Sequence, residues 1–536
     1  MERFARLLSE LIYTRSRNGK LALLAAYLRT APDPDRGWAL AGLTGGLDFP
    51  AIKAGIVRDL IKERVDPVLF GLSRDFVGDT AETVSLLWPT PLGVAGPAPS
   101  VSEAITALSA ATRLSARTVL AGLLDSLDEE GRFALLKLAT GALRIGVSAR
   151  LAKTAFAQAF TVPLEEVEEI WHALDPPYAP LFNWAEGRAP KPDISALPVF
   201  RPFMLANPLE DDSVDLAHYA AEWKWDGIRI QLVHAGGETR LFSRGGEDIT
   251  ASFPEVAGVF ASESVLDGEL LVRGAQQGGE AGGAASFNAL QQRLGRKTVS
   301  NSLQTEYPAF VRLYDILTEG AEDLRQLPWT QRRSRLEAFA AHLDPSAFDV
   351  SALIEADSFE VLEELRAQTR ESGIEGVMLK KRDSLYEAGR KAGLWYKWKR
   401  DPLTADCVLM YAQRGSGKRS GYYSDFTFGC WTGSEAEGGP LLLPVGKAYS
   451  GFSDEELRWL DSFVRKNTMN RFGPVREVEK SLVLEVAFDA VNPSSRHKSG
   501  IAMRFPRISR IRRDKPAAEA DQIETLRRMI AIGDKA

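Results

Sequence analysis

Glu-Trp-Lys-Trp-Asp-Gly-Ile-Arg, at residues 222–229, places a lysine between two tryptophans and just before an Asp-Gly pair. The Asp-Gly pair is typical of a turn, and the apolar run Ile228–Val233 that follows predicts a strand. A lysine in this position can be partly desolvated, and desolvation and nearby cations both favour the neutral amine that a nucleophile needs. Lys224 is therefore a candidate nucleophile. Taken alone, the six-residue pattern is better interpreted as an ordinary turn before a strand.

Further short motifs follow Lys224 in a fixed order. They are Ser243–Gly246, Asp267–Leu270, Tyr314–Leu317, Glu375–Lys380, Trp395–Lys399, and Arg504–Arg507 continuing to Arg512–Lys515. Together they supply two carboxylates on predicted strands for a metal, an aromatic ring for a base, and cations for phosphates. These are the groups that an attack on a nucleoside triphosphate requires.

The composition narrows the class of protein. Of the 536 residues, 45% are hydrophobic and 26% charged, as in average globular proteins, and the length predicts three or four domains. No apolar run approaches the ~20 residues of a membrane helix, and the N-terminus lacks the apolar region of a secretory signal, so we expect no membrane partner. Cys407 and Cys430 are too few for a disulfide framework or a four-cysteine zinc site. We expect both to be buried and unreactive, in a reducing cytoplasm.

The net charge of −6 argues against a nucleic-acid partner, but the charge is unevenly distributed. The segment from Arg496 to Lys515 is strongly basic and contains one acidic residue, Asp514. Its basic residues are Arg496, Lys498, Arg504, Arg507, Arg510, Arg512, Arg513 and Lys515. This basic segment could contact phosphates, and a solvated basic face is an equally good interpretation of it alone.

Changes of pattern divide the chain. Residues 1 to about 190 are expected to be helical, with apolar residues at helical spacing from Phe4 to Ile12 and capping boxes at Ser100–Glu103 and Ser126–Glu129. Prolines between Pro176 and Pro198 indicate a domain boundary.

From about 198 to 400, strands alternate with helices. Strands are expected at Ile228–Val233, Ser264–Val272, Ala309–Ile316 and Gly376–Lys380, helices at Trp329–Leu343 and Phe359–Glu371, and a surface loop at Gly274–Ala285. Beyond 401 the apolar residues mostly alternate, as in Thr404–Tyr411, Asp425–Trp431 and Ser481–Phe488, which predicts a small β-barrel. The segment Gly415–Lys418 lacks the spacing of a phosphate loop, and we expect a basic hairpin there.

The ordered motifs resemble those of the covalent nucleotidyltransferases, a superfamily of DNA ligases, RNA ligases and mRNA capping enzymes. The best match is to ATP-dependent DNA ligases. Arg201–Ala206 resembles the start of their adenylation domain, and Leu143–Ser148 a segment of the helical DNA-binding domain of archaeal, eukaryotic and some bacterial ligases. The resemblance implies an all-α DNA-binding domain (1–195), an α+β adenylation domain (196–401) and a C-terminal OB-fold β-barrel (402–536).

The resemblance also implies residue roles. Lys224 would attack the α-phosphorus of ATP and hold AMP as a phosphoramidate. Glu222 would accept a hydrogen bond from the adenine amine, and Tyr314 would stack on adenine, where many relatives have Phe. Arg229 and Arg244 would contact the ribose and the nick phosphate.

The remaining implied roles concern metal and phosphates. Glu269 and Glu375 would serve the ribose and a divalent cation, Mg²⁺ or Mn²⁺. Lys397 and Lys399 would bind the α-phosphate and help to depress the pKa of Lys224. Lys391 would make a further nucleotide contact with Arg390 beside it, although relatives often carry arginine at that position. The C-terminal motif, with Arg512 and Lys515, would orient the leaving pyrophosphate.

The function implied is sealing of nicks in double-stranded DNA through lysyl-AMP and DNA-adenylate, in replication, repair or recombination. The protein would be a monomer that encircles DNA at the nucleoid. An RNA ligase or capping enzyme would not need the long helical N-terminal region, and an NAD-dependent ligase would need four zinc-binding cysteines. A non-catalytic clamp would have lost the lysine or a carboxylate. Simpler roles remain open for Asp226 and Asp267 as turn residues, and for Tyr314, Trp395 and Trp398 as packing residues.

Overall fold

A computed structural model describes the chain except for residues 90–96, 142, 144, 195, 211–213, 275–283, 285–286, 295, 297, 369–372, 416–420, 434–438 and 531–536. Most of the expected loop at Gly274–Ala285 and of the hairpin at Gly415–Lys418, together with Arg144, lies outside the described residues. The chain forms two units, Met1–Pro202 and Phe203–Ala536. In the described part of the chain, no helix has the length and apolar character needed to cross a membrane.

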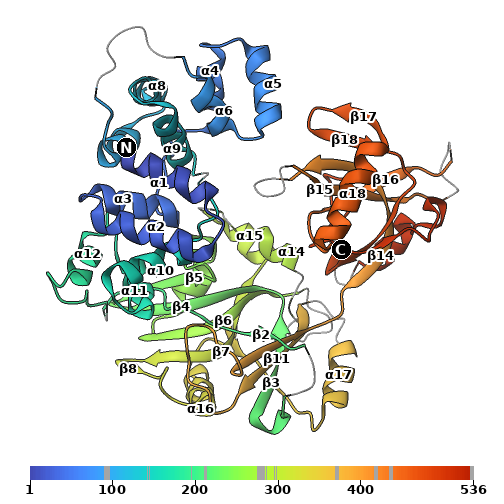
Figure 1. Ribbon diagram of the computed structural model, residues 1–536. Coiled ribbons are helices and arrows are strands. Elements are labelled where there is room, and N and C mark those ends of the chain that lie inside the picture. Colours follow the sequence, from blue (N-terminus) through green and yellow to red (C-terminus); the bar gives the residue numbers. More distant parts are fainter. Residues whose placement is uncertain are drawn as a thin grey trace. The chain divides into compact units, whose positions relative to one another are not determined.

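The first unit is all-α, as predicted (Figure 1, blue to teal). Its α-helices are α1 Glu2–Tyr13, α2 Arg17–Thr30, α3 Asp35–Thr44, α4 Ala54–Lys62, α5 Pro67–Val77, α6 Thr80–Leu87, α7 Val101–Ala110, α8 Ala116–Asp125, α9 Glu129–Ala139, α10 Ala149–Phe160, α11 Leu164–Ile170 and α12 Ala179–Ala185, with a 3₁₀ turn at Trp171–Ala173. Helix α1 buries Phe4, Leu7, Leu8 and Leu11, whereas Ile12 remains largely exposed. The apolar stripe therefore faces the core.

One of the two predicted capping boxes is confirmed and the other is wrong. Ser100 accepts a hydrogen bond from the backbone N–H of Glu103, whose side chain accepts one from Ser100, at the start of α7. Ser126 instead ends α8 and donates its hydroxyl to the Leu123 carbonyl. Helix α9 is capped by Asp128, which accepts from the Gly131 N–H. Asp is as good an N-cap as Ser. Asp128, two residues after Ser126, therefore caps α9, and the helix begins at Glu129.

The second unit begins with strands and helices around two main sheets (Figure 1, green to light orange). The strands are β1 Met204–Leu205, β2 Asn207–Pro208, β3 Tyr219–Trp225, β4 Ile228–Ala235, β5 Glu238–Ser243, β6 Ser264–Val272, β7 Ala309–Glu319, β8 Glu322–Asp323, β9 Phe348–Val350, β10 Leu353–Ile354, β11 Ile374–Lys381, β12 Gly389–Arg390 and β13 Trp395–Lys399. The α-helices are α13 Pro254–Gly258, α14 Phe287–Gln291, α15 Asn301–Glu306, α16 Trp329–Ala340 and α17 Phe359–Gln368, with 3₁₀ turns at Leu216–His218 and Thr250–Ser252.

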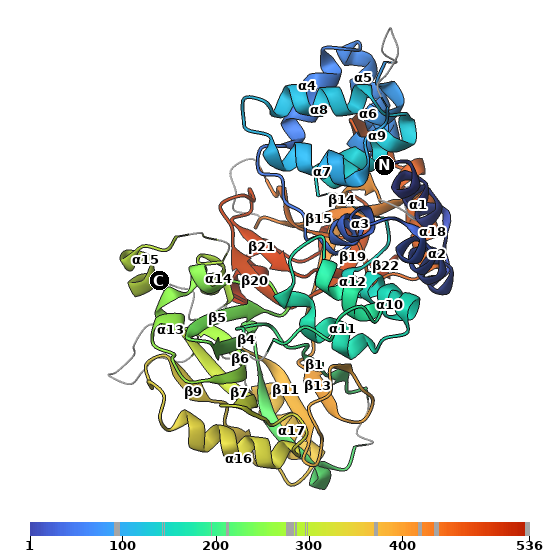
Figure 2. The same ribbon diagram turned by 90° about the vertical axis from the view of Figure 1, so that its left-hand side faces the viewer.

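The predicted elements of this region are confirmed, with small shifts at their ends. Strand β6 has the predicted bounds, and α16 ends at Ala340 rather than at Leu343. One sheet has the order β10-β3-β11-β13-β2 and the other β5-β4-β6-β7-β8, with β9 beside β7. Helix α16 packs on β7 and β9, which Figure 2 shows from the side.

Strand register determines which side chains meet in the first sheet. Glu222 of β3 and Lys397 of β13 both lie opposite Met378 of β11. Two residues further along, Lys224 and Lys399 both lie opposite Gly376. Side chains two apart on a strand share a face. The predicted residues of β3 and β13 therefore form two neighbouring rows on one face.

The C-terminal part is β-rich, as predicted for the OB-fold (Figure 1, orange to red). Its elements are β14 Leu403–Arg414, β15 Tyr423–Trp431, β16 Leu442–Ala448, α18 Asp454–Lys466, β17 Thr468–Phe472, β18 Val475–Val478, β19 Val483–Phe488, β20 Ala490–Pro493, β21 Ile501–Arg504, β22 Arg507–Arg512 and α19 Ile523–Arg528, with a 3₁₀ turn at Ala517–Glu519. Strand β14 pairs with β15, β18 and β19, and β19 pairs with β22. Cys407 and Cys430 are fully buried in its core, with their sulfurs 3.5 Å apart, so the expected burial is confirmed.

Candidate active site

Three charged side chains meet where β3, β11 and β13 run side by side. The ammonium of Lys224 pairs with Oε1 of Glu375, and the Nζ of Lys399 lies 2.7 Å from Oε2 of the same carboxylate. Glu375 precedes Gly376, where the β3–β11 register shifts. The structure therefore brings together the candidate nucleophile, a candidate metal ligand and a candidate phosphate-binding lysine.

The two candidate metal carboxylates differ in their electrostatics. Burial alone would raise the pKa of Glu375, but Lys224 and Lys399 hold it below its usual value. Burial raises the pKa of Glu269 to about 8, although Lys224 and Arg229 lower it, and the nearby charge of Glu375 adds a smaller rise. No ion pair engages Glu269 within the described ranges. Its carboxyl group is therefore available to a cation.

This donor set fits Mg²⁺ or Mn²⁺. Carboxylate oxygens are the hard ligands that these ions prefer, and Mg²⁺ commonly uses one or two carboxylates together with substrate phosphates. Among the described residues, no cluster of three or more His, Cys, Asp or Glu side chains could hold a metal by itself. Glu269 and Glu375 would thus hold an ion that is completed by nucleotide phosphates.

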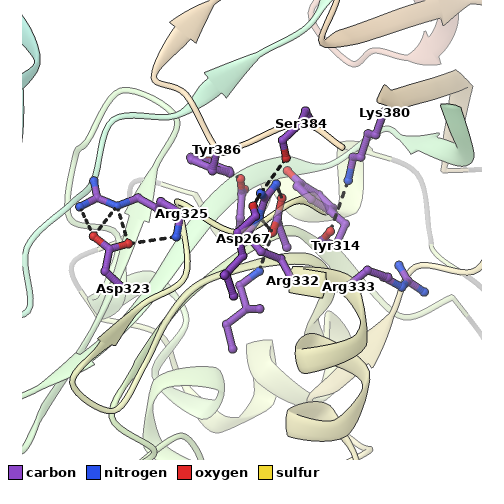
Figure 3. Close-up of polar contacts among 12 residues, drawn as sticks. Asp267, Tyr314, Asp323, Arg325, Arg332, Arg333, Lys380, Ser384 and Tyr386 are labelled. Atoms are coloured by element: carbon purple, nitrogen blue, oxygen red, sulfur yellow. Dashed lines mark hydrogen bonds and ion pairs between the residues drawn. The ribbon is translucent and has the colours of Figure 1, made fainter. Parts of the chain in front are cut away.

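Glu222 is fully buried and paired with Lys380, which has no role among the predicted site residues. The Nζ of Lys380 lies 3.2 Å from both carboxylate oxygens of Glu222. It also donates to the Tyr314 carbonyl at 3.3 Å, as Figure 3 shows. A guanidinium nitrogen of Arg333 approaches Glu222 at 3.7 Å. The Glu222 carboxylate, predicted to accept from adenine, is thus already bound by a buried cation.

Aromatic rings surround the Lys380 ammonium. It lies 4.4 Å from the ring centre of Tyr314 and 4.7 Å from that of Trp395, which is buried. Tyr314 itself is only partly buried. Trp398 instead packs against Phe359 of α17 at a centroid distance of 5.9 Å. Trp395 therefore lies beside Tyr314, while Trp398 serves packing.

Arg229 is held by a buried aspartate. Its guanidinium donates to both oxygens of Asp267, at 3.1 and 2.6 Å, and to the Met204 carbonyl at 2.8 Å. Asp267 is fully buried on β6, where an unpaired charge would be costly. Its simpler interpretation as a turn residue is wrong, because it lies within a strand and pairs with Arg229.

Further predicted cations gather near Lys397. Burial lowers the pKa of Lys397, and the nearby charges of Arg390, Lys399, Lys224 and Arg244 lower it further. Lys391, next to Arg390, instead pairs with Glu387 at 3.6 Å. Of the two adjacent basic residues, Arg390 is thus the one that contributes to the cation cluster.

The two predicted residues of the C-terminal motif form ion pairs away from Lys224. Arg512 and Lys515 both pair with Asp406, at 3.1 and 2.8 Å, and Arg512 also pairs with Asp514. No contact within the described part of the chain joins either of them to Lys224. A role in pyrophosphate release would require these ion pairs to break.

Comparisons with known proteins agree with this geometry. Residues 203–399 match the family described as ATP dependent DNA ligase domain, and residues 419–515 match the ATP dependent DNA ligase C terminal region. A probable DNA ligase of Koribacter versatilis is 34% identical over 486 residues, covering 85% of this chain and 79% of that protein. DNA ligase 1 of Korarchaeum cryptofilum is 33% identical over 411 residues, covering 75% and 72%.

A solved structure titled Pmar-Lig_PreS3 shares the fold, with a TM-score of 0.59 and 18% identity over 95% of this chain and 99% of that one. The two family matches together cover more than half of the sequence. The chain belongs to the ATP-dependent DNA ligases.

Proposed function

We propose that Lys224 is the residue on which this ligase carries AMP. The family uses ATP and seals nicks through an enzyme adenylate and a DNA adenylate. The observation that carries the proposal is the row of Lys224 and Lys399 on either side of Gly376, with the Glu375 carboxylate between the two ammonium groups. This arrangement would place the nucleophile Lys224 beside a phosphate-binding cation, Lys399, and a carboxylate, Glu375.

The first step forms a bond between Nζ of Lys224 and the α-phosphorus and breaks the bond to pyrophosphate. Lys224 must first leave its ion pair with Glu375 and lose a proton, because only a neutral amine has a lone pair to donate. Lys397 and Lys399 would stabilise the charge that develops on the α-phosphate oxygens. Mg²⁺ or Mn²⁺, held by Glu269 and Glu375, would neutralise phosphate charge.

Two further displacements complete the reaction. The nick 5′-phosphate attacks lysyl-AMP and releases Lys224, and the 3′-hydroxyl then attacks the DNA adenylate and expels AMP. Arg229, Arg244, Arg390 and Tyr314 would hold the nucleotide and the nick phosphate.

We also propose nicked double-stranded DNA as the partner of a monomeric enzyme, acting at the nucleoid in the cytoplasm, where such DNA lies. Contacts would go mainly to phosphate and sugar, since a sealing enzyme need not read sequence. The basic segment supports this, because Arg496, Lys498 and Arg510 form no ion pair within the described residues. Binding should then weaken steeply with salt.

The test is transfer of label from α-labelled ATP to the protein. Lys224→Ala should give no labelled protein yet still bind nicked DNA, which shows that it folds. Lys381→Ala is a matched control, because Lys381 lies on β11 and its one ion pair among the described residues is with the exposed Asp383. It should label like wild type. Undiminished labelling of Lys224→Ala would overturn the proposal.

A further inference from the structure

Tyr386 lies outside every motif that the sequence singled out, yet its hydroxyl contacts two residues of the candidate site, Asp267 and Arg229. The side chain is buried, and the hydroxyl donates to Oδ2 of Asp267 at 2.7 Å. The hydroxyl oxygen of Tyr386 also accepts a long hydrogen bond from Nη2 of Arg229 at 3.4 Å. Figure 3 shows Tyr386 next to Asp267. Tyr386 therefore connects the buried carboxylate to the arginine that it holds.

The ring of Tyr386 is fixed from several sides. It meets Trp395 edge-on, with centroids 5.9 Å apart, and the guanidinium of Arg332 lies 5.6 Å from its centre. Arg332 is itself held by Asp315 and by the Ser384 carbonyl (Figure 3). The backbone N–H of Tyr386 donates to the Arg325 carbonyl at 2.9 Å. The hydroxyl is thus held in place by rigid neighbours.

The guanidinium of Arg229 keeps one hydrogen-bond donor for a ligand. A guanidinium has five N–H groups. Within the described residues, Nε donates to Asp267, Nη2 donates to Asp267 and Tyr386, and Nη1 donates to Met204. One N–H of Nη1 therefore remains for a ligand, and its direction is set by the contacts that hold the other four.

We propose that Tyr386 is a positioning residue for nucleotide binding: its hydroxyl orients Asp267, and through it Arg229, so that the remaining Nη1 N–H is directed at the nucleotide. This inference rests on the proposed contact of Arg229 with the nucleotide. Burial raises the pKa of Tyr386 well above its usual value, so the hydroxyl keeps the proton that it donates. Tyr386 itself touches no reacting atom.

Tyr386→Phe tests the inference, because it keeps the ring and removes only the hydroxyl. The rate of lysyl-AMP formation is measured against ATP concentration and normalised to the fraction of molecules that can be labelled. The KM for ATP should rise about tenfold, as expected for a lost hydrogen bond to a charged group, at an unchanged maximal rate. Damage to the fold would instead lower the labelled fraction and leave KM unchanged.

Tyr219→Phe is the matched control. Tyr219 is the first residue of β3 in the first sheet, and its hydroxyl donates to the Gly393 carbonyl at 2.6 Å rather than to Asp267. Its KM for ATP should equal that of wild type. An equal rise in both variants would show that any lost tyrosine hydroxyl has this effect, and would overturn the inference.

Arg229→Lys separates this inference from the proposed function. Lysine keeps the charge but cannot form the two-pronged pair with Asp267. It should raise the KM for ATP, and adding Tyr386→Phe should then change little, because the residue being positioned is gone. A raised KM in Arg229→Lys with a normal KM in Tyr386→Phe overturns only the role of Tyr386. A normal KM in Arg229→Lys overturns the nucleotide contact itself.

Discussion

Arg504 of β21 donates to both carboxylate oxygens of Asp226, which follows β3, with Nη2 and Oδ1 2.9 Å apart. Both side chains are largely buried. The pair joins the turn after Lys224 to the first arginine of the Arg-Phe-Pro-Arg sequence, 278 residues away. Asp226 is thus more than a turn residue, because it ties the adenylation region to the β-rich region of the second unit.

Reversing one charge of this pair should slow nick sealing. Asp226→Arg would face Arg504 and separate the two regions, so the sealing rate should fall at least about tenfold, given the cost of an unpaired, partly buried charge. The double variant Asp226→Arg/Arg504→Asp restores opposite charges and should recover most of the rate. Single-turnover sealing of a nicked duplex measures both. A double variant as slow as the single one would contradict the role of the pair.

Gly376 should tolerate no side chain. Its φ is +153°, and an added Cβ would lie 2.3 Å from the Trp398 carbonyl oxygen on the neighbouring strand. Gly376→Ala would push β13 away, together with Lys397 and Lys399. Misplacement of reacting groups by about 1 Å can cost about a hundredfold in rate, so lysyl-AMP formation should fall by that order.

The control for this substitution is Gly393→Ala. Gly393 also has a positive φ, +76°, but nothing lies within 4 Å of an added Cβ. It should lose about 1–2 kcal/mol of stability from backbone strain and keep its adenylation rate. Equal rates for the two variants would show that the spacing of β11 and β13 does not matter.

The stability of the metal-free protein should depend on pH through Glu269. Its pKa is raised to about 8 in the folded protein from an ordinary value of 4.5. Between these values the folded protein holds a proton that the unfolded chain has released. The stabilisation is therefore complete below pH 4.5 and is lost as the pH rises towards 8.

Glu269→Gln has no such proton and should lack this dependence. With a chelator present, the thermal midpoint of wild type relative to Glu269→Gln should fall between pH 5 and pH 8, with a slope of at most about 1.4 kcal/mol per pH unit in stability. The difference between the two proteins cancels the titration of all other groups. Parallel curves would mean that the carboxyl titrates normally.

How far the sequence predicts the site depends on the range of the interactions. Lys224, Glu375 and Lys399 were predicted together, because each lies in a short motif whose order along the chain resembles a known family. The contacts of Tyr386 with Asp267 and of Lys380 with Glu222 join residues more than 100 positions apart. A single sequence carries no signal for such pairs, apart from the expectation that a buried charge finds a partner.

The contacts of the C-terminal motif were likewise not predictable from the sequence, because they depend on how the domains are arranged. The sequence assigned Arg512 and Lys515 to the leaving pyrophosphate, whereas the structure pairs both with Asp406 of β14. Motif resemblance predicts which residues act but not which arrangement of the domains the chain adopts. Their predicted role stays a prediction, as do the domain boundaries at 195/196 and 401/402.

The last prediction concerns the buried ion pair of Lys380 and Glu222 and its contribution to the stability of the second unit. Both side chains are almost completely inaccessible, so removing the lysine charge leaves the buried Glu222 carboxylate with the longer contact to Arg333, at 3.7 Å. Lys380→Met should therefore destabilise the second unit by about 3–5 kcal/mol, as for other broken buried ion pairs. Lys381→Met, at the next and more exposed position of β11, should stay within about 0.5 kcal/mol of wild type.

The double variant Glu222→Gln/Lys380→Met decides the cause. The double variant removes both charges. If the loss in Lys380→Met comes from the Glu222 carboxylate left without its lysine, much of the lost stability should return. Urea unfolding followed by tryptophan fluorescence measures Glu222→Gln, Lys380→Met and the double variant, since Trp223 and Trp395 lie in this sheet. If the two substitutions simply add, packing around the lysine stem rather than its charge holds this part of the sheet together.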